Sequence, residues 1–181
     1  HGWINFRMRA MLMSFASYQL WLPWQESGLC LARKFIDYEP GIHWTQCQMQ
    51  SGTTAINTIR IYNPIKQGYD HDKEGIFIRT WVKELQDLPT KYIHEPWKID
   101  LFHQNDSTFV LGENYPLPII DPIISAKTAL KKLKEIRNKP GFFDIANKIL
   151  EKHGSQKKRK SQFKKNKIKP DLHNQLNLNL N

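Results

Sequence analysis

Residues 35–44 gather side chains that could do chemistry in one short stretch, whose sequence is FIDYEPGIHW. Asp37 and Glu39 are carboxylates two positions apart, and they could serve as fixed hydrogen-bond acceptors. His43 adds a ring that titrates near neutral pH, and Trp44 adds an aromatic surface. The stretch could therefore supply acceptors, a titratable ring and an aromatic surface in one place.

Arg9 is a basic side chain inside an otherwise apolar predicted helix. A buried guanidinium needs a carboxylate partner, because an unpaired internal charge is very costly. Asp37 is the natural partner, and such a pair could hold fixed charges beside a bound ligand. An ordinary structural ion pair is the alternative, and these two residues alone do not separate the two interpretations.

A second polar cluster precedes the apolar residues 76–81, and it consists of Asp70, His71, Asp72 and Glu74. These residues do not follow the spacing of a calcium-binding loop. Acidic side chains just before an apolar helix stabilise its N-terminus. We therefore predict a helix start here and no metal site.

Helices must position these groups, and apolar residues at helical spacing predict five of them. They run over 5–22, about 29–36, about 75–85, from Ser125 to a stop at 138–141, and over 142–150. Asn5 is a predicted N-cap, and Pro23 ends the first helix. Segments without this spacing are predicted as loop or irregular chain: 38–62, a break at 63–64, and 89–124. No strand pattern is apparent, so the predicted fold class is all-α with long loops.

Charge and composition separate the end of the chain from its body. The formal net charge is +10, and residues 152–181 carry +8 of it. The body must therefore bind any nucleic acid through a local patch, and the Lys- and Asn-rich tail is predicted to be disordered. No apolar run is long enough to span a membrane. Two cysteines in no metal-ligand spacing fit a reducing compartment, so we expect a cytoplasmic protein. We also expect it to be a monomer.

Four stretches together resemble the photolyase/cryptochrome family: residues 3–9 (WINFRMR), 35–44, 60–64 (RIYNP) and 93–97 (IHEPW). The resemblance implies that residues 1–122 are the C-terminal half of a helical FAD-binding domain. A helical extension over 123–151 and the basic tail over 152–181 would follow. The resemblance also implies a longer parent protein, in which a missing N-terminal domain could hold an antenna chromophore.

The resemblance implies a set of FAD-binding residues, which are Trp3, Phe6, Arg9, Asp37, Glu39 and His43. His43 stands where family members face the reactive nitrogen of the flavin, usually with Asn, so we expect a catalytic role for it. Trp24 matches the middle residue of the aromatic chain that re-reduces photoexcited flavin, and it is the second expected catalytic residue. Cys47 stands where the flavin-proximal residue of that chain is expected, so the usual relay is interrupted. Possible detours are Trp44, Trp21 and Tyr18.

The resemblance also implies a DNA-binding face made of Arg7, Met49, Arg60, Lys66 and Gln67, with Arg79 nearby. Arg and Lys would hold phosphates and position the duplex without reading its sequence. Two positions depart from the photolyase pattern. Met49 replaces a Trp that packs on the flipped-out pyrimidine dimer, and Ala10 stands where photolyases often have Met.

The implied activity is that of a deoxyribodipyrimidine photolyase, which repairs cyclobutane pyrimidine dimers in damaged DNA by light-driven electron transfer from FAD. The alternative is a cryptochrome-like blue-light photoreceptor that lacks repair activity and works through a signalling partner. Cys47, Met49 and Ala10 favour the photoreceptor, whereas Arg7, Arg60 and the basic tail favour DNA. A third alternative is a helical module that has lost its flavin function.

Overall fold

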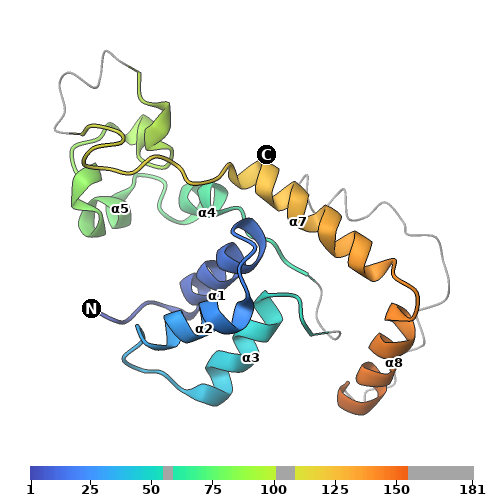
Figure 1. The fold of residues 1–181 in the computed structure, drawn as a ribbon. Helices are drawn as coiled ribbons and strands as arrows, with labels where there is room; N and C mark the ends of the chain where they lie inside the picture. The colour runs from blue at the N-terminus through green and yellow to red at the C-terminus, as the bar shows by residue number, and fades with distance from the viewer. Residues whose placement is uncertain (55–58, 101–108, 155–181) are drawn as a thin grey trace. The chain divides into compact units, whose positions relative to one another are not determined.

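The computed structural model describes residues 1–54, 59–100 and 109–154 of the 181-residue chain (Figure 1). The regular structure of the described residues is helical, apart from an isolated bridge between Leu111 and Tyr115, so the predicted all-α class is confirmed. Among the described residues, two compact units form, one within 1–62 and 122–154 and the other within 63–121. The predicted tail falls almost wholly outside the described residues, and the predicted division into domains stays a prediction.

The first unit begins with α1 (Phe6–Ser14), which continues into a π-helical turn, η1 (Phe15–Gln19). Asn5 caps α1 as predicted, because its side chain accepts a hydrogen bond from the Met8 amide at 3.0 Å. The predicted helix over 5–22 is thus confirmed as far as Gln19. Trp21, two residues later, has a φ of 54°, a left-handed conformation that stops the helix before Pro23.

The next helix, α2, spans Trp24–Ala32, so the predicted helix over 29–36 was placed too late in the chain. Pro23 was predicted to end the first helix, but that helix has already stopped at Gln19, and Pro23 instead precedes the first turn of α2, where its missing N–H costs nothing. The chain then turns, and the Ile36 amide donates to the Gly2 carbonyl at 2.9 Å. This hydrogen bond holds the residues after α2 against the N-terminal segment.

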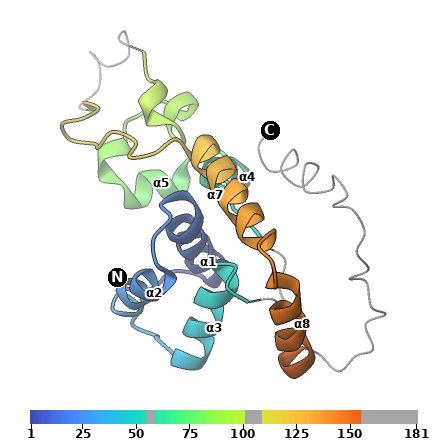
Figure 2. The ribbon, with the colours of Figure 1, turned by 45° about the vertical axis from the view of Figure 1, so that its right-hand side comes forward.

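Helix α3 spans Pro40–Gln50, and here the prediction of loop over 38–62 was wrong. Glu39 caps the helix, and Pro40 occupies its first turn, where proline is favoured. The helical spacing of α3 was not recognised in the sequence, because several residues on its buried side are polar. Helices α1, α2 and α3 pack against one another, as both ribbon views show (Figures 1 and 2).

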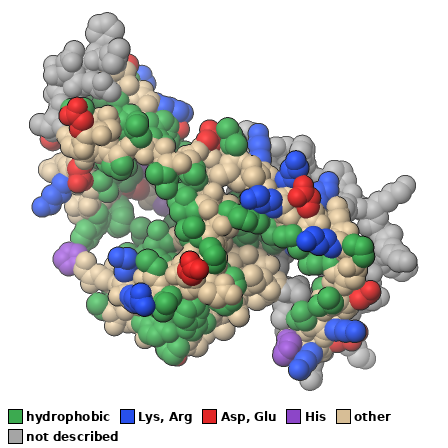
Figure 3. Space-filling model, in the orientation of Figure 1, with side chains coloured by type: hydrophobic (Ala, Val, Ile, Leu, Met, Phe, Trp, Pro, Cys, Tyr) green, Lys and Arg blue, Asp and Glu red, His purple; other side chains and the backbone are tan. Residues whose placement is uncertain are grey.

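Two further helices complete the first unit: α7 (Pro122–Arg137), which packs on η1, and α8 (Phe142–His153). Helix α7 begins at Pro122, three residues before the predicted cap, and it ends at the predicted stop, where Gly141 has a φ of 79°. Lys and Arg side chains gather along α7 (Figure 3). One of them, Lys132, lies 4.5 Å from the centre of the Trp21 ring.

The second unit contains α4 (Pro64–His71), α5 (Ile76–Trp81) and short 3₁₀ turns at Lys83–Leu85, Thr90–Tyr92 and Pro96–Lys98. Its core is formed by Leu85, Leu88, Tyr92, Ile93, Ile99 and Phe109. The predicted break at 63–64 is the start of α4, because the Asn63 side chain caps it. The predicted irregularity of 89–124 holds for its described part up to Asp121. Among the described residues, no helix is both long and apolar enough to cross a membrane.

Asp72 confirms the predicted helix start in the second unit. Its carboxylate oxygens accept hydrogen bonds from the Phe77 and Ile78 amides at 3.0 Å each. The predicted helix over 75–85 is shorter than expected, with α5 ending at Trp81 and a 3₁₀ turn following. No group of three potential metal ligands occurs in the ranges that the structure describes.

Candidate functional site

A cavity of about 270 Å³ lies within the first unit, between α1, α3 and the segments that precede them. Its lining includes all six residues that the sequence predicted for a cofactor site: Trp3, Phe6, Arg9, Asp37, Glu39 and His43. The structure therefore brings these six side chains to one place, although they come from separate parts of the chain. Trp3 and Phe6 are 60% and 53% exposed, so they offer apolar surface to a ligand.

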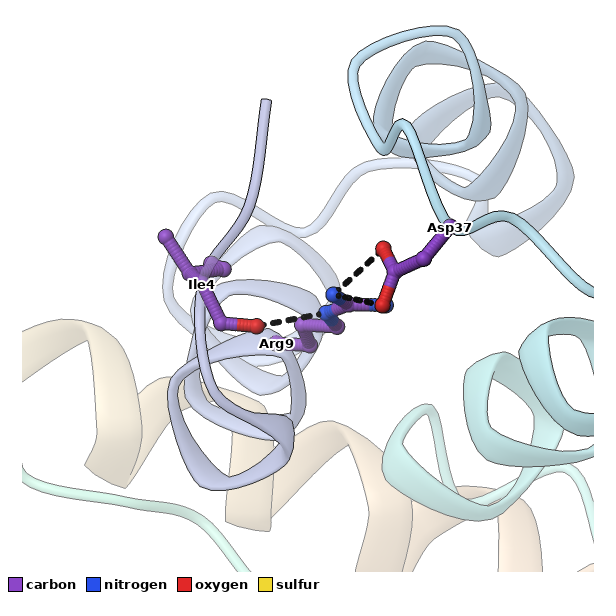
Figure 4. Close-up of polar contacts among 3 residues, drawn as sticks. All are labelled: Ile4, Arg9 and Asp37. Atoms are coloured by element: carbon purple, nitrogen blue, oxygen red, sulfur yellow. Dashed lines mark hydrogen bonds and ion pairs between the residues drawn. The ribbon is translucent and has the colours of Figure 1, made fainter. Parts of the chain in front are cut away.

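Arg9 and Asp37 form the charged centre of the cavity wall (Figure 4). Arg9 Nη2 donates to both carboxylate oxygens of Asp37, at 2.7 and 2.8 Å, and Arg9 Nε donates to the Ile4 carbonyl at 2.9 Å. The guanidinium also lies 4.4 Å from the centre of the Phe35 ring. The predicted pair is thus confirmed, and its position is fixed from several directions.

One face of α3 forms the opposite set of lining residues: His43, Gln46, Cys47 and Gln50. Their spacing is i, i+3, i+4 and i+7, which places them on one side of a helix. His43 Nε2 lies 2.8 Å from the Gly28 carbonyl of α2, and because a carbonyl oxygen can only accept, this nitrogen carries a hydrogen and donates it. That hydrogen bond joins α2 to α3 and fixes the orientation of the ring.

Glu39 lines the cavity, but its carboxylate also has a structural task. Its two oxygens accept hydrogen bonds from the Gly41 and Ile42 amides, at 3.1 and 2.6 Å. These amides are unpaired donors at the start of α3, which a carboxylate satisfies well. The carboxylate therefore both begins the helix and adds negative charge at the edge of the cavity.

Cys47 is 2% exposed and lies with its Sγ 3.4 Å from His43 Nε2. Burial raises the pKa of the Cys47 thiol to about 11. The thiol is therefore protonated at neutral pH, where it is a poor nucleophile and metal ligand. This residue fills space in the cavity wall.

Aromatic rings lead from the cavity towards α2. Tyr38 lines the cavity, and its hydroxyl accepts a hydrogen bond from Trp44 Nε1 at 3.0 Å. Trp44 in turn meets Trp24 edge to face, with ring centres 6.2 Å apart. Trp24 itself is not among the lining residues, so its predicted catalytic role would require an intermediate group.

The residues predicted for DNA binding are divided between the two units. Arg7, Met49 and Arg60 belong to the first unit, whereas Lys66 and Gln67 lie on α4 of the second. Arg7 and Arg60 are exposed, and none of the five lines the cavity. Their DNA-binding role stays a prediction.

Arg79, which the sequence placed near the same face, has a structural task in the second unit. Its Nη1 donates to the carbonyls of Gln86 and Leu88 at 2.7 and 2.6 Å, and its Nη2 donates to the Thr90 hydroxyl at 3.2 Å. These contacts hold the chain between α5 and the following 3₁₀ turns. The guanidinium is therefore engaged within the protein.

The sequence did not single out Gln46 or Gln50, which also line the cavity. The signal that could have found them is their helical spacing from His43 and Cys47. It was missed because residues 38–62 were predicted as loop, and a period is sought among apolar residues first. Taken together, the lining offers aromatic walls, one fixed ion pair and uncharged polar groups, which suits a flat aromatic ligand with a polar edge.

Comparison with known proteins agrees with this description. A family model described as the FAD binding domain of DNA photolyase matches residues 1–135. The deoxyribodipyrimidine photo-lyase of Alkalihalophilus pseudofirmus is 38% identical over 135 residues, 74% of this chain and 28% of that protein. Cryptochrome-2 of Arabidopsis thaliana is 36% identical over 133 residues, 72% of this chain and 22% of that protein.

Among solved structures, a bacterial class III photolyase from Agrobacterium tumefaciens superposes with a TM-score of 0.71 at 30% identity. The superposition covers 77% of this chain and 29% of that one, so the chain spans less than a third of each of these relatives. The predicted resemblance and the predicted helical domain are both confirmed. Since the family model covers well over half of its residues, the chain belongs to the family of FAD-binding domains of DNA photolyase, which includes photolyases and cryptochromes.

Proposed function

We propose that this chain forms part of the FAD site of a light-driven deoxyribodipyrimidine photolyase. The observation that carries the proposal is that the six residues implied by the resemblance line one cavity around the Arg9–Asp37 pair. The names of the relatives support the enzyme class, since several are called deoxyribodipyrimidine photo-lyase.

The lining residues fit the flavin ring of FAD. Trp3, Phe6 and Phe35 provide aromatic and apolar surface for a planar ring, while Arg9 and Asp37 provide charges that are held in place. Gln46 and Gln50 add uncharged polar side chains to the lining. A ring with N–H and carbonyl groups along its edge can satisfy such a wall.

FAD, when bound, would absorb blue light and supply the electron whose transfer to a cyclobutane pyrimidine dimer splits the ring bonds and whose return completes the cycle. The protein's own residues would bind and orient the reactants. Arg9 and Asp37 would hold fixed charges beside a flavin whose own charge changes on reduction. The His43 ring, held by its hydrogen bond to the Gly28 carbonyl, would form part of the cavity wall. Arg7, Met49, Arg60, Lys66 and Gln67 would contact the damaged DNA, chiefly through its phosphates.

A cryptochrome-like photoreceptor is the second candidate function, and two observations favour it. Cys47 occupies the place of an aromatic relay residue next to the cavity, and the cavity wall holds Ala10 where photolyases often have Met. Such a protein would bind FAD and respond to blue light, but it would act through a signalling partner. Cryptochromes are among the relatives, as the Arabidopsis protein shows.

One experiment separates these functions. The intact protein is purified, its flavin absorbance is recorded, and it is illuminated with blue light on DNA that carries defined cyclobutane dimers. We expect bound flavin and loss of dimers in the light, with none in the dark and no change in undamaged DNA. Bound flavin with light-driven reduction but no repair would replace the photolyase by the photoreceptor. A protein that binds no FAD would refute both.

A further inference from the structure

Helix α7 concentrates the positive charge of the chain that precedes the basic tail. Residues 1–121 carry eleven Lys or Arg side chains and thirteen Asp or Glu side chains, which is a net charge of −2. Residues 122–139, which are α7 and the two residues after it, carry six basic side chains and one acid, a net charge of +5. Helix α8 has a mixed polar face, with two acids and two lysines. The excess of basic side chains is therefore specific to α7.

Three lysines of α7, Lys127, Lys131 and Lys134, form what we call the lysine row. Their spacing of i, i+4 and i+7 places them on the same side of the helix, and all three are exposed. The helix buries Ala126 and Ala129 instead. Lys and Arg side chains are visible along α7 in Figure 3. The lysine row therefore presents positive charge to the solvent.

Acidic side chains do not neutralise the lysine row. No ion pair joins any of its members to an acid of the described chain. Glu135, the single acid of α7, stands four residues after Lys131, a spacing at which a pair could form, but the two are not paired. Like charges three and four residues apart on a helix repel each other. A partner of opposite charge would relieve this repulsion.

The geometry of the lysine row fits a linear polyanion. From Lys127 to Lys134 the helix axis advances about 10.5 Å, at about 1.5 Å per residue, and the phosphates of one DNA strand follow each other at about 3.4 Å along the duplex. The row therefore spans about three phosphates. Between these two lysines α7 exposes no large apolar side chain, which insertion into a lipid surface would require.

We propose that the lysine row of α7 binds the phosphate backbone of nucleic acid, without regard to base sequence or lesion. Lysine suits this task because its ammonium group binds phosphate as a point charge. The row is an addition to the predicted DNA-binding residues, none of which lies on α7. Phosphate binding needs neither flavin nor a dimer, so the inference goes beyond the proposed function and does not depend on it.

The test compares two triple variants of the intact protein, each of which lowers the net charge by three. The row variant combines Lys127→Gln, Lys131→Gln and Lys134→Gln. The control variant makes the same change at three exposed lysines outside α7, and it combines Lys34→Gln, Lys73→Gln and Lys83→Gln. Binding to a short undamaged DNA duplex is measured in the dark by fluorescence anisotropy, over a series of salt concentrations.

We expect the row variant to bind the duplex on the order of 100-fold more weakly than the wild type at about 0.1 M salt. Each lost phosphate contact lowers the slope of log affinity against log salt by about 0.9, so this slope should fall by about 2–3 in the row variant. In the control variant it should change by less than about 0.5. The flavin absorbance of the purified protein should be the same in both variants as in the wild type.

Three results would overturn the proposal: a wild type that does not bind the duplex, equal changes of slope in the two variants, or an unchanged slope in the row variant. Equal changes would mean that net charge alone is responsible. If the row variant binds DNA normally but no longer binds vesicles that contain phosphatidylserine, the row belongs to a lipid surface instead.

Circular dichroism shows whether the row variant is folded. If it is not, the three single variants replace it, each with an expected fall in slope of about 0.9, and no fall in any of them would overturn the proposal. A wild type that binds undamaged DNA but neither holds FAD nor repairs dimers would refute the proposed function and leave this inference intact.

Discussion

Replacing Asp37 by Asn tests whether the Arg9–Asp37 pair contributes through its charge. The asparagine side chain is isosteric and could still accept one hydrogen bond from Arg9, so the change removes mainly the Coulombic attraction. The Asp37 side chain is 47% exposed and that of Arg9 is 20% exposed, so water screens the pair considerably. We therefore expect Asp37→Asn to lower the free energy of unfolding by only about 1 kcal/mol.

Replacing Arg9 by Met should cost more, because Arg9 makes three different contacts. It would lose the ion pair, worth about 1 kcal/mol, the charged hydrogen bond to the Ile4 carbonyl, worth about 1.5 kcal/mol, and the contact with the Phe35 ring, worth about 0.5 kcal/mol. The expected loss is about 3 kcal/mol. The difference in free energy of unfolding between the two variants measures the contacts of Arg9 that do not involve Asp37.

The assay is urea unfolding of the intact protein without FAD, followed by circular dichroism at low and high salt. At about 1 M salt the Debye length is about 3 Å, close to the 2.7 Å between Arg9 Nη2 and Asp37 Oδ1, so the effect of Asp37→Asn should become smaller, while most of the effect of Arg9→Met should persist. Asp87→Asn, the same change at an exposed acid outside the α-helices, serves as the control and should change stability by less than about 0.5 kcal/mol. The explanation is wrong if Asp37→Asn lowers the free energy of unfolding as much as Arg9→Met does, or if its effect is the same at low and high salt.

Two further predictions concern the packing beneath the cavity. Only Cys30, which is exposed, should react with a thiol reagent at pH 8, because Cys47 is buried and its pKa is raised to about 11; two equally reactive thiols per folded chain would contradict this. Gly28→Ala should lower stability by about 1–3 kcal/mol, because the new Cβ would lie 2.8 Å from Trp44 Cζ3 and 3.1 Å from Cys47 Sγ. Urea unfolding measures the second effect, and a neutral result would show that α2 and α3 can separate freely.

The charged pair of the site was predictable from sequence because one simple rule about charges among apolar residues applies to it. A guanidinium among apolar residues requires a carboxylate, and few carboxylates were available near the predicted helix ends. Asn5 and Asp72 were predictable for the same kind of reason, since helix termini need side-chain acceptors. Such rules depend on single residues and their immediate neighbours, which a sequence displays directly.

Helix α3 was not predictable in the same way, because its pattern is polar. The four residues that line the cavity, His43, Gln46, Cys47 and Gln50, are spaced as a helical face but are mostly not apolar. Their burial comes from the arrangement of α1 and α2 around them, which local propensity does not contain. The composition of residues 38–62 therefore predicted loop at the place where the fold forms a helix.

The position of Cys47 has a consequence for any electron route through this protein. Its Sγ packs against Gly28 and His43, so an aromatic ring at position 47 would not fit without moving α2 away from α3. Rings instead connect the cavity to Trp24 through Tyr38 and Trp44, which share a hydrogen bond of 3.0 Å. If Trp24 takes part in flavin chemistry here, Tyr38 and Trp44 lie between it and the cavity, as does the His43 ring, whose centre is 5.1 Å from that of Trp44. Cys47 is then a packing residue of the wall.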